Sequence, residues 1–431
     1  MRVAWFSPLP PVRSGIAAYS AALIPRLTGS VAIDAFAETN AYDFVWMHRR
    51  APYDLVVYHL GNASCHDYIW AYLARYPGLV VVHDPRLHHA RARQLLSQRR
   101  FDDYRREFWY DHPDAPRDVV EYAVEGLSGP IYYTWSMLGV VVRTARMVAV
   151  HNPRVAADLR EEFPGTRIEP IRLGTLAFQT EAAARGRVRA SLGVSERAML
   201  FAAFGTITAE KRVGAILRAV ATLARQGADV HLVLAGDASD CAGLDADLAA
   251  AAIAPRVHVI GYVPDEAVGD YLAAADACLC LRWPTALETS ASWVQCLAAA
   301  RPTLITDLAH LVDVPTVDLR NRHVSRSSIE PVAIAIDLLD EEGALLAAMR
   351  ALTEDRGLRE TLGRAGRAYW SANHTVDAMV DDYRRVISIA ASQPAPHVTD
   401  LPEHFLHDHT SKARTLARDF SVDLDILRLR S

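Results

Sequence analysis

The sequence predicts two doubly wound α/β domains, each built on a parallel sheet, that face each other across a cleft. Two observations lead to this prediction. A chain of 431 residues exceeds what one hydrophobic core usually supports. Short, continuously apolar runs also alternate with helical segments in both halves of the chain. Such runs are typical of parallel strands buried on both faces, and two series of them indicate two domains of this class.

The expected strands follow one another at regular spacing. In the first half they are 3–7, 31–36, 54–59, 79–83 and 147–151. In the second half they are 199–204, 230–235, 257–260, 277–281 and 303–306. Polar, alanine-rich residues around 174–186 mark the boundary, so we expect one domain over 1–178 and another over 179–368. The tail 392–431, which has Pro394 and Pro396 near its start, is expected to be an appended helix or extended arm.

Composition excludes several classes of protein. An apolar content of 51% and a charged content of 23% are typical of a soluble globular chain. A net charge of −5 gives no global field that would favour nucleic acid, so we expect no nucleic-acid partner. Five cysteines without CxxC spacing favour a reducing compartment and no zinc site. No apolar run approaches the ~20 residues that span a bilayer, and we expect a cytoplasmic protein.

Lys211 is one of only two lysines in the chain, against 46 basic residues in total. It follows the expected strand 199–204 and Gly205, and precedes an amphipathic segment, 213–224. A strand, a glycine turn and a helix with a cation between them form a place where phosphate can bind. An ordinary surface lysine at a helix start is the alternative, and Lys211 alone does not decide between them.

Two candidate sites follow strands of the first half. After the first strand, prolines forbid a helix until Ser14-Gly15, where free N–H groups could hold an anion or simply form a capped turn. After the fourth strand comes His83-Asp84, at the sheet edge where ligands of open α/β folds bind. A neutral histidine there could bond to a sugar hydroxyl or take a proton, although a structural role is the commoner one.

A third candidate site is the segment 281–292, which leads into an apolar helix. Glu288 is followed by Thr289, Ser290 and Ala291, which would place hydroxyls and free N–H groups beside a carboxylate. Phosphate would then bind at the helix start, and Glu288 could accept hydrogen bonds from sugar hydroxyls. The same residue types also suit an ordinary helix cap.

Taken together and in their order along the chain, these candidate sites resemble the motifs of family 4 glycosyltransferases (glycosyl transferases group 1) of GT-B fold. The similarity extends over roughly residues 1–390. The matching segments are 14–20, 205–211, 284–290 and 301–307. The resemblance implies two Rossmann-like domains around a cleft, with a helix over 369–391 that crosses back to the first domain.

The resemblance also implies a role for individual residues. It implies that Lys211 neutralises the donor diphosphate, that Glu288 contacts donor-sugar hydroxyls and that His83 touches the transferred sugar. The other residues implied to bind the donor are Ser14, Gly15, Gly205, Arg212, Tyr262, Val263, Thr289, Ser290 and Ala291. The implied reaction is retaining transfer from a nucleotide diphosphate sugar to a hydroxyl of a glycan or lipid-linked acceptor, without cofactor or essential metal. Such enzymes build bacterial cell-surface polysaccharides.

Three positions depart from the family pattern. The second glutamate of its E-x7-E motif would fall at Cys296, whose thiol is a poor acceptor for ribose hydroxyls. The arginine usual after Gly205 is Thr206, for which Arg212 is the substitute considered. The glycine usual before Glu288 is Leu287, which restricts the loop. These departures keep open a non-catalytic nucleotide-sugar- or glycan-binding protein, and a sugar-nucleotide epimerase is a further alternative.

The segment 84–146 is longer than a simple connection between strands. It is rich in arginines and aromatic residues. A solvated helix face over core aromatics is the first interpretation. The alternative is an acceptor-binding surface, and the Arg-rich stretch 86–106 is then a candidate for peripheral contact with a membrane.

Overall fold

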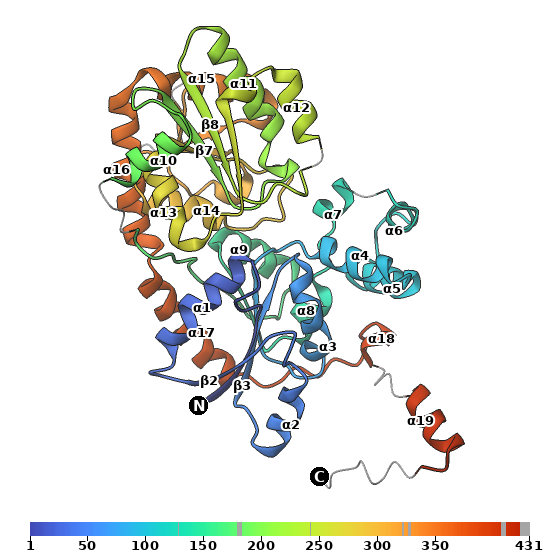
Figure 1. The fold of residues 1–431 in the computed structure, drawn as a ribbon. Helices are drawn as coiled ribbons and strands as arrows, with labels where there is room; N and C mark the ends of the chain where they lie inside the picture. The colour runs from blue at the N-terminus through green and yellow to red at the C-terminus, as the bar shows by residue number, and fades with distance from the viewer. Residues whose placement is uncertain are drawn as a thin grey trace.

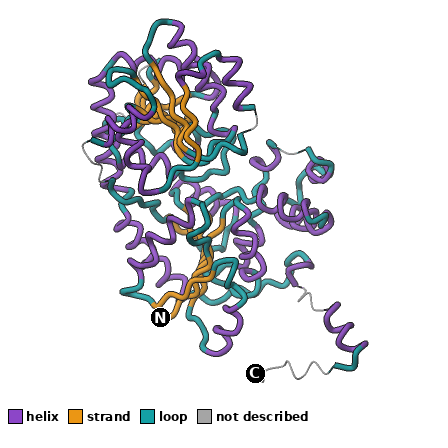
Figure 2. Tube along the Cα trace, in the orientation of Figure 1, coloured by secondary structure: helices purple, strands orange, loops and turns teal. Residues whose placement is uncertain are grey.

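The computed structural model describes residues 1–127, 129–178, 183–241, 243–320, 323–325, 329–406 and 411–422. Two α/β domains are stacked one above the other in Figure 1, and Figure 2 shows a separate group of strands in each. The predicted fold class is confirmed, because each half contains a largely parallel sheet between helices. The predicted boundary at 178/179 adjoins residues 179–182, which lie outside the described residues.

The first domain has a six-stranded parallel sheet of order β2-β1-β3-β4-β5-β6. Its strands are β1 (Arg2–Phe6), β2 (Ala32–Phe36), β3 (Leu55–Leu60), β4 (Leu79–Val82), β5 (Met147–Val150) and β6 (Ile168–Pro170). Its helices are α1 (Gly15–Leu27), α2 (Asp43–Arg50), α3 (Trp70–Leu73), α4 (His88–Ser97), α5 (Phe101–Asp111), α6 (Val119–Val124), α7 (Pro130–Thr134), α8 (Gly139–Thr144) and α9 (Pro153–Glu162). Strands β3, β4 and β5 are buried throughout, which explains their continuously apolar sequences.

The second domain has an eight-stranded sheet of order β13-β12-β14-β11-β10-β7-β8-β9. Its strands are β7 (Met199–Phe204), β8 (Val230–Ala235), β9 (Val257–Gly261), β10 (Ala277–Cys280), β11 (Thr303–Thr306), β12 (Thr316–Asp318), β13 (His323–Val324) and β14 (Ala333–Ile336). Its helices are α10 (Ala184–Ser191), α11 (Val213–Arg225), α12 (Leu244–Ala251), α13 (Asp265–Ala274), α14 (Ala291–Ala298), α15 (Glu341–Glu354) and α16 (Arg356–Asn373). Only the short edge strand β13 runs antiparallel to its neighbour.

The ten strands expected from the sequence are all present, with ends that shift by one residue at most. The sequence analysis missed β6, β12, β13 and β14. Three of these have only two or three residues, and their pairing partners rather than their own apolar pattern define them. Because β14 is buried between β11 and β12, it extends the sheet beyond the last expected strand.

The chain returns to the first domain through α16 and α17 (Val376–Ser392), rather than through one helix over 369–391. The break lies at His374-Thr375, where Thr375 caps α17 by accepting a hydrogen bond from the Ala378 amide at 3.2 Å. Thr375 also pairs with Thr175 of the first domain. In the first domain α17 lies beside α1 (Figure 1), and the hydroxyl of Tyr19 bonds to that of Tyr383 at 2.7 Å.

The C-terminal extension returns to the face of the first domain that bears α5. Leu401 is buried in the core of that domain. The short helix α18 (Glu403–Leu406) then packs on α5, where His404 and Glu107 bond through Nε2 and Oε1 at 2.7 Å. Beyond it, α19 (Ser411–Asp419) leads away from the domain in Figure 1. Part of the C-terminal extension, around α18, is therefore packed against the insertion between β4 and β5.

Candidate active site

The side chain of Lys211 lies beneath the end of β7. The strand ends at Phe204, Gly205 turns the chain at a φ of +79°, and Ala209–Lys211 forms a single 3₁₀ turn before α11. Lys211 is 9% exposed, and its Nζ donates to the carbonyl oxygen of Phe204. A Cβ atom at residue 205 would lie 3.2 Å from that Nζ, so glycine leaves room around the amine. Burial, aided by the charge of Arg282, lowers the pKa of Lys211 to about 7.

A second cation of the site is Arg282, which the sequence analysis did not single out. Its backbone N–H donates to Thr306 Oγ1 at 2.9 Å, which fixes the loop after β10 against the end of β11. Its Nε lies 2.8 Å from Glu288 Oε1. Its positive charge contributes to the lowered pKa of Lys211, so the two cations are close enough to influence each other. Arg282 lies six positions before Glu288, within the candidate segment 281–292.

The side chain of Arg212 is directed to α15. Its guanidinium forms two bonds to the carboxylate of Glu341, at 2.7 and 2.6 Å, at the start of α15. The backbone at Arg212 is left-handed, with a φ of +60°, where the 3₁₀ turn meets α11. This arrangement argues against the prediction that Arg212 replaces the missing phosphate cation, because its guanidinium is held at the start of α15, whereas the carboxylate paired with Arg282 lies in the pocket itself.

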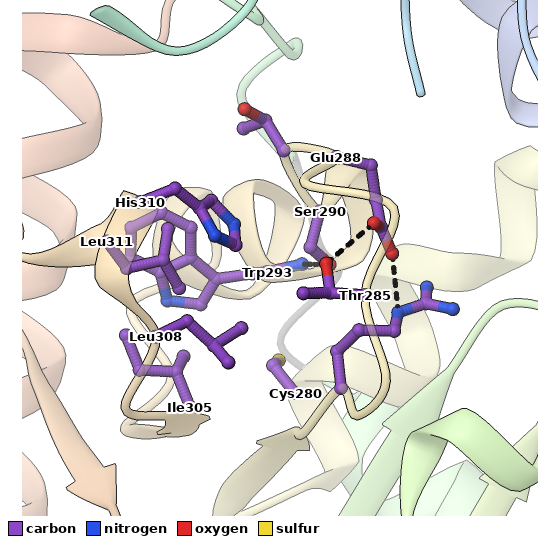
Figure 3. A pocket seen from close by; sticks show the side chains of 11 residues that line it. Cys280, Thr285, Glu288, Ser290, Trp293, Ile305, Leu308, His310 and Leu311 are labelled. Atoms are coloured by element: carbon purple, nitrogen blue, oxygen red, sulfur yellow. Dashed lines mark hydrogen bonds and ion pairs between the residues drawn. The ribbon is translucent and has the colours of Figure 1, made fainter. Parts of the chain in front are cut away.

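The loop that carries Glu288 is held by Thr285. The Thr285 hydroxyl donates to Glu288 Oε2 at 2.9 Å and accepts from the Leu287 amide at 3.0 Å. Leu287 has a φ of +64°, a conformation that glycine adopts far more readily than leucine. The expected restriction of this loop therefore has a physical basis. Figure 3 shows Glu288 joined by dashed lines to both of its partners.

The start of α14 presents the predicted hydroxyl groups. Ser290 caps the helix, since its Oγ accepts from the Trp293 amide at 3.2 Å. Ala291 is the exposed first residue, at a helix end where free N–H groups can bind an anion. Thr289 Oγ1 donates to the carbonyl oxygen of His151 at 3.3 Å, so this helix start touches the first domain.

One pocket, which Figure 3 shows from close by, is lined by Arg282, Thr285, Glu288 and the start of α14, whereas Lys211 is not among its lining residues. Its lining residues are Cys280, Arg282, Thr285, Glu288, Thr289, Ser290, Trp293, Ile305, Leu308, His310 and Leu311. Cys296 does not line it: the residue is fully buried, and its Sγ lies 3.9 Å from that of Cys280. Cys296 is thus a core residue on the inner face of α14. It offers no group to the pocket, and the predicted weakness of the ribose contact stays a prediction.

The Ser14–Gly15 loop opens α1 as predicted from its residue types. Ser14 Oγ accepts from the Ala17 amide at 3.0 Å, and a Cβ atom at Gly15 would meet nothing within 4 Å. A ligand could therefore approach the backbone closely there. Next to this loop, the guanidinium of Arg13 lies 4.6 Å from the ring centroid of Tyr262. Tyr262 is half exposed and Val263 is buried, so the predicted base-binding turn meets the predicted donor loop.

His83 has both ring nitrogens engaged by other histidines. Nε2 lies 3.0 Å from His59 Nδ1, and Nδ1 lies 3.2 Å from His151 Nε2. Burial lowers the pKa of His83 well below its usual value, so the ring is neutral. The edge of the Tyr19 ring packs against it at 5.1 Å. This arrangement argues against the predicted sugar contact, because neither nitrogen is left to bond to a hydroxyl.

The insertion between β4 and β5 folds as the short helices α4 to α8. Its arginines are largely paired with carboxylates: Arg91 with Glu107, Arg93 with Asp67, Arg100 with Asp103, Arg105 with Asp102 and Glu121, and Arg106 with Asp103 and Glu403. Pairing removes much of the positive field on which the expected membrane contact of 86–106 depended. At the other end, Tyr133 donates to Glu210 Oε1 at 2.8 Å, so the insertion reaches the turn that carries Lys211.

Within the described part of the chain, none of the helices is long and apolar enough to cross a membrane. No group of three or more His, Cys, Asp or Glu side chains in those residues is arranged to hold a metal ion. The absence of an essential metal stays a prediction.

Comparison with known proteins finds a family similarity in the second domain. Residues 198–339, which contain Lys211, Arg282 and Glu288, match the family model described as Glycosyl transferases group 1. Over this segment the second domain is similar to the group 1 glycosyltransferases. The match bears out the predicted resemblance to that family. A search of curated proteins finds no match to the chain.

Solved structures support the fold over nearly the whole chain. Anabaena HepE, crystallised with UDP-glucose, aligns at a TM-score of 0.60 and 14% identity over 90% of this chain and 100% of its own. Sucrose-phosphate synthase from Thermosynechococcus elongatus aligns at 0.62 and 15%, with the same coverage. WaaG, a glycosyltransferase involved in lipopolysaccharide biosynthesis, aligns at 0.58 and 13%, covering 90% and 99%. At these identities the similarity shows the GT-B fold alone.

Proposed function

We propose that this glycosyltransferase moves a hexose-type sugar from a nucleotide diphosphate sugar to a hydroxyl of a glycan or lipid-linked acceptor, with retention at the anomeric carbon. The observation that carries the proposal is the convergence of Lys211, Arg282 and the start of α14 beside Glu288. Two cations and a helix N-terminus can hold a diphosphate, and a carboxylate next to them can bind sugar hydroxyls. The UDP-glucose in the HepE crystal supports this class of donor.

The chemistry follows from these charges. Breaking the bond between sugar and phosphate develops positive charge on the anomeric carbon and negative charge on the departing diphosphate. Lys211 and Arg282 would stabilise the diphosphate, and such stabilisation is usually the largest single contribution to catalysis. In the proposed mechanism the leaving phosphate takes the acceptor's proton on the same face of the sugar. The reaction would use no cofactor or essential metal, and we place it in the cytoplasm.

The acceptor would enter between the insertion and the second domain. Tyr133 and Glu210 join the two domains beside the Lys211 turn. Trp283, which is 44% exposed, donates its backbone N–H to the Glu210 carbonyl oxygen at 2.7 Å. An exposed aromatic ring at the mouth of such a site suits the apolar face of a sugar ring. A glycan acceptor fits these groups better than a membrane surface does.

A thermal-shift screen with UDP-, GDP- and dTDP-hexoses tests the donor class. We expect one nucleotide to raise the Tm, as any ligand that binds only the folded state must. Proton NMR of the reaction with a sugar acceptor should then show release of nucleoside diphosphate and a product with the donor's anomeric configuration. Binding of none of these donors would overturn the proposal, and an inverted product would overturn the retaining mechanism.

A further inference from the structure

In the proposed function Glu288 binds the transferred sugar from the second domain. His83 of the first domain has both ring nitrogens bound to other histidines. Asp84, the next residue, lies at the carboxyl end of β4, on the sheet edge where α/β folds bind their ligands.

The carboxylate of Asp84 is held in place by Asn62. The Asn62 backbone N–H donates to Asp84 Oδ2 at 2.7 Å. The Asn62 side chain also donates to the carbonyl oxygen of Arg86 at 2.8 Å and accepts from the Ala90 amide at 3.1 Å. These bonds join the end of β3, the end of β4 and the first turn of α4. Among the described residues, none donates a hydrogen bond to the other oxygen, Oδ1.

The surroundings of Asp84 are those of the donor site. A Cβ atom at Gly61 would lie 3.0 Å from both Asp84 Oδ2 and the side chain of Ile16, so Asp84 stands beside the start of α1. Burial and the negative charge of Glu288 raise the pKa of Asp84 to about 6, with a smaller opposing effect of Arg282.

Contacts between the domains agree with this: Thr289, next to Glu288, bonds to the carbonyl oxygen of His151 at 3.3 Å. The His151 ring lies 3.2 Å from that of His83, the residue before Asp84. Two carboxylates brought together where the domains meet are typical of a functional site rather than of a structural ion pair.

We propose that Asp84 is the second carboxylate of the donor-sugar subsite: opposite Glu288, it accepts a hydrogen bond from a hydroxyl of the transferred sugar and excludes donors whose sugar carries a carboxylate. This inference rests on the proposed function and adds its substrate class, a neutral hexose rather than a uronic acid. Because Arg282 already pairs with Glu288, the charge of Asp84 opposes a further anion on the sugar.

The test compares wild type with Asp84→Asn, which keeps an oxygen for the Asn62 amide but removes the charge. Calorimetric Kd values are measured for a hexose donor and its uronate counterpart on the base found in the donor screen, UDP-glucose and UDP-glucuronate if that base is uridine. Loss of a hydrogen bond to a charged group should weaken hexose binding about 10-fold or more in Asp84→Asn. In wild type, the Kd of the uronate donor should be about 30-fold or more higher than that of the hexose donor. In Asp84→Asn this ratio of the two Kd values should be about 10-fold smaller. Asp102→Asn, at an exposed position of α5, should change neither value.

A second measurement needs no variant and so does not depend on how Asp84→Asn folds. In wild type, the ratio of uronate to hexose Kd should shrink as the pH falls from 7.5 to 5, because Asp84 takes up a proton near pH 6 while the uronate stays charged. Equal binding of both donors at pH 7.5, or an unchanged ratio in Asp84→Asn, would overturn the inference and leave the proposed function standing. Failure of every nucleotide sugar to bind would instead overturn both.

Discussion

On the second-domain face of the cleft, Lys211, Arg282 and Glu288 are charged groups whose partners lie within the site itself. On the first-domain face, His59, His83 and His151 are neutral rings bonded in a row. Both faces occupy the carboxyl ends of parallel strands, but it is the second-domain face that brings Lys211 and Arg282 together with a carboxylate. The difference indicates that the second domain holds the diphosphate and that the first shapes the sugar subsite and the acceptor side.

Removing charge from the second-domain face should have the largest effect. We expect Lys211→Met and Glu288→Ala each to lower kcat/KM about 10²- to 10³-fold, since an electrostatic contact of a transition state contributes about 3–4 kcal/mol. Steady-state kinetics with the donor identified in the screen measures this. The Tm of both variants serves as the control for folding. Turnover within a few fold of wild type in either variant would end the assignment of these residues.

The pH dependence of kcat/KM sharpens the comparison, because the two faces should limit activity at opposite ends of the pH range. Lys211 must be protonated to attract the diphosphate, so kcat/KM should fall about tenfold per unit as the pH rises above about 7. Asp84 must be ionised, so kcat/KM should also fall below about pH 6. Arg282→Ala removes a positive neighbour of Lys211 and should move the alkaline limb to higher pH. An alkaline limb that stays in place in this variant would show that Arg282 does not act on Lys211.

His83→Asn should have the smallest effect on catalysis. The change breaks a row of bonded histidines beneath the Tyr19–Tyr383 contact, so we expect the free energy of unfolding to fall by about 1–3 kcal/mol. Turnover by the folded variant should remain within about threefold of wild type, since ordinary substitutions outside the contacts of the transition state leave kcat/KM nearly unchanged. Denaturation and kinetics on the same preparation separate the two outcomes. A hundredfold loss of kcat/KM with unchanged stability would instead place His83 on the sugar.

The second-domain face could be predicted from the sequence because its residues belong to two short segments at strand ends. A lysine in a strand–glycine–helix turn predicts an anion-binding site from local backbone geometry alone. The same is true of a helix that starts with Glu-Thr-Ser. Arg282 was missed although it lies in the second segment. Its role depends on a bond to Glu288 and on its effect on Lys211, and neither follows from spacing.

The first-domain face could not be predicted in the same way. His83 stands at the expected edge of the sheet, but its neighbours in space come from residues 24 and 68 positions away. Only the tertiary structure shows that its nitrogens are occupied and that the charge of Glu288 acts on Asp84 beside it. Similarly, Arg212 adjoins Lys211 in the sequence, but Glu341, 129 residues further on, directs its guanidinium to α15. Local sequence patterns predict where a site lies. Contacts between residues far apart in the sequence determine which side chains of that segment are available to bind a ligand.

The most direct test of the account measures which arginine assists Lys211. Calorimetric titration with the preferred nucleoside diphosphate gives Kd for wild type, Arg282→Ala and Arg212→Ala. The account predicts that Arg282→Ala weakens binding about 10- to 100-fold, as expected for loss of a charge-assisted contact, while Arg212→Ala leaves it within about threefold. The reverse order, with Arg212→Ala weakened and Arg282→Ala unchanged, would contradict the assignment of the diphosphate to Lys211 and Arg282.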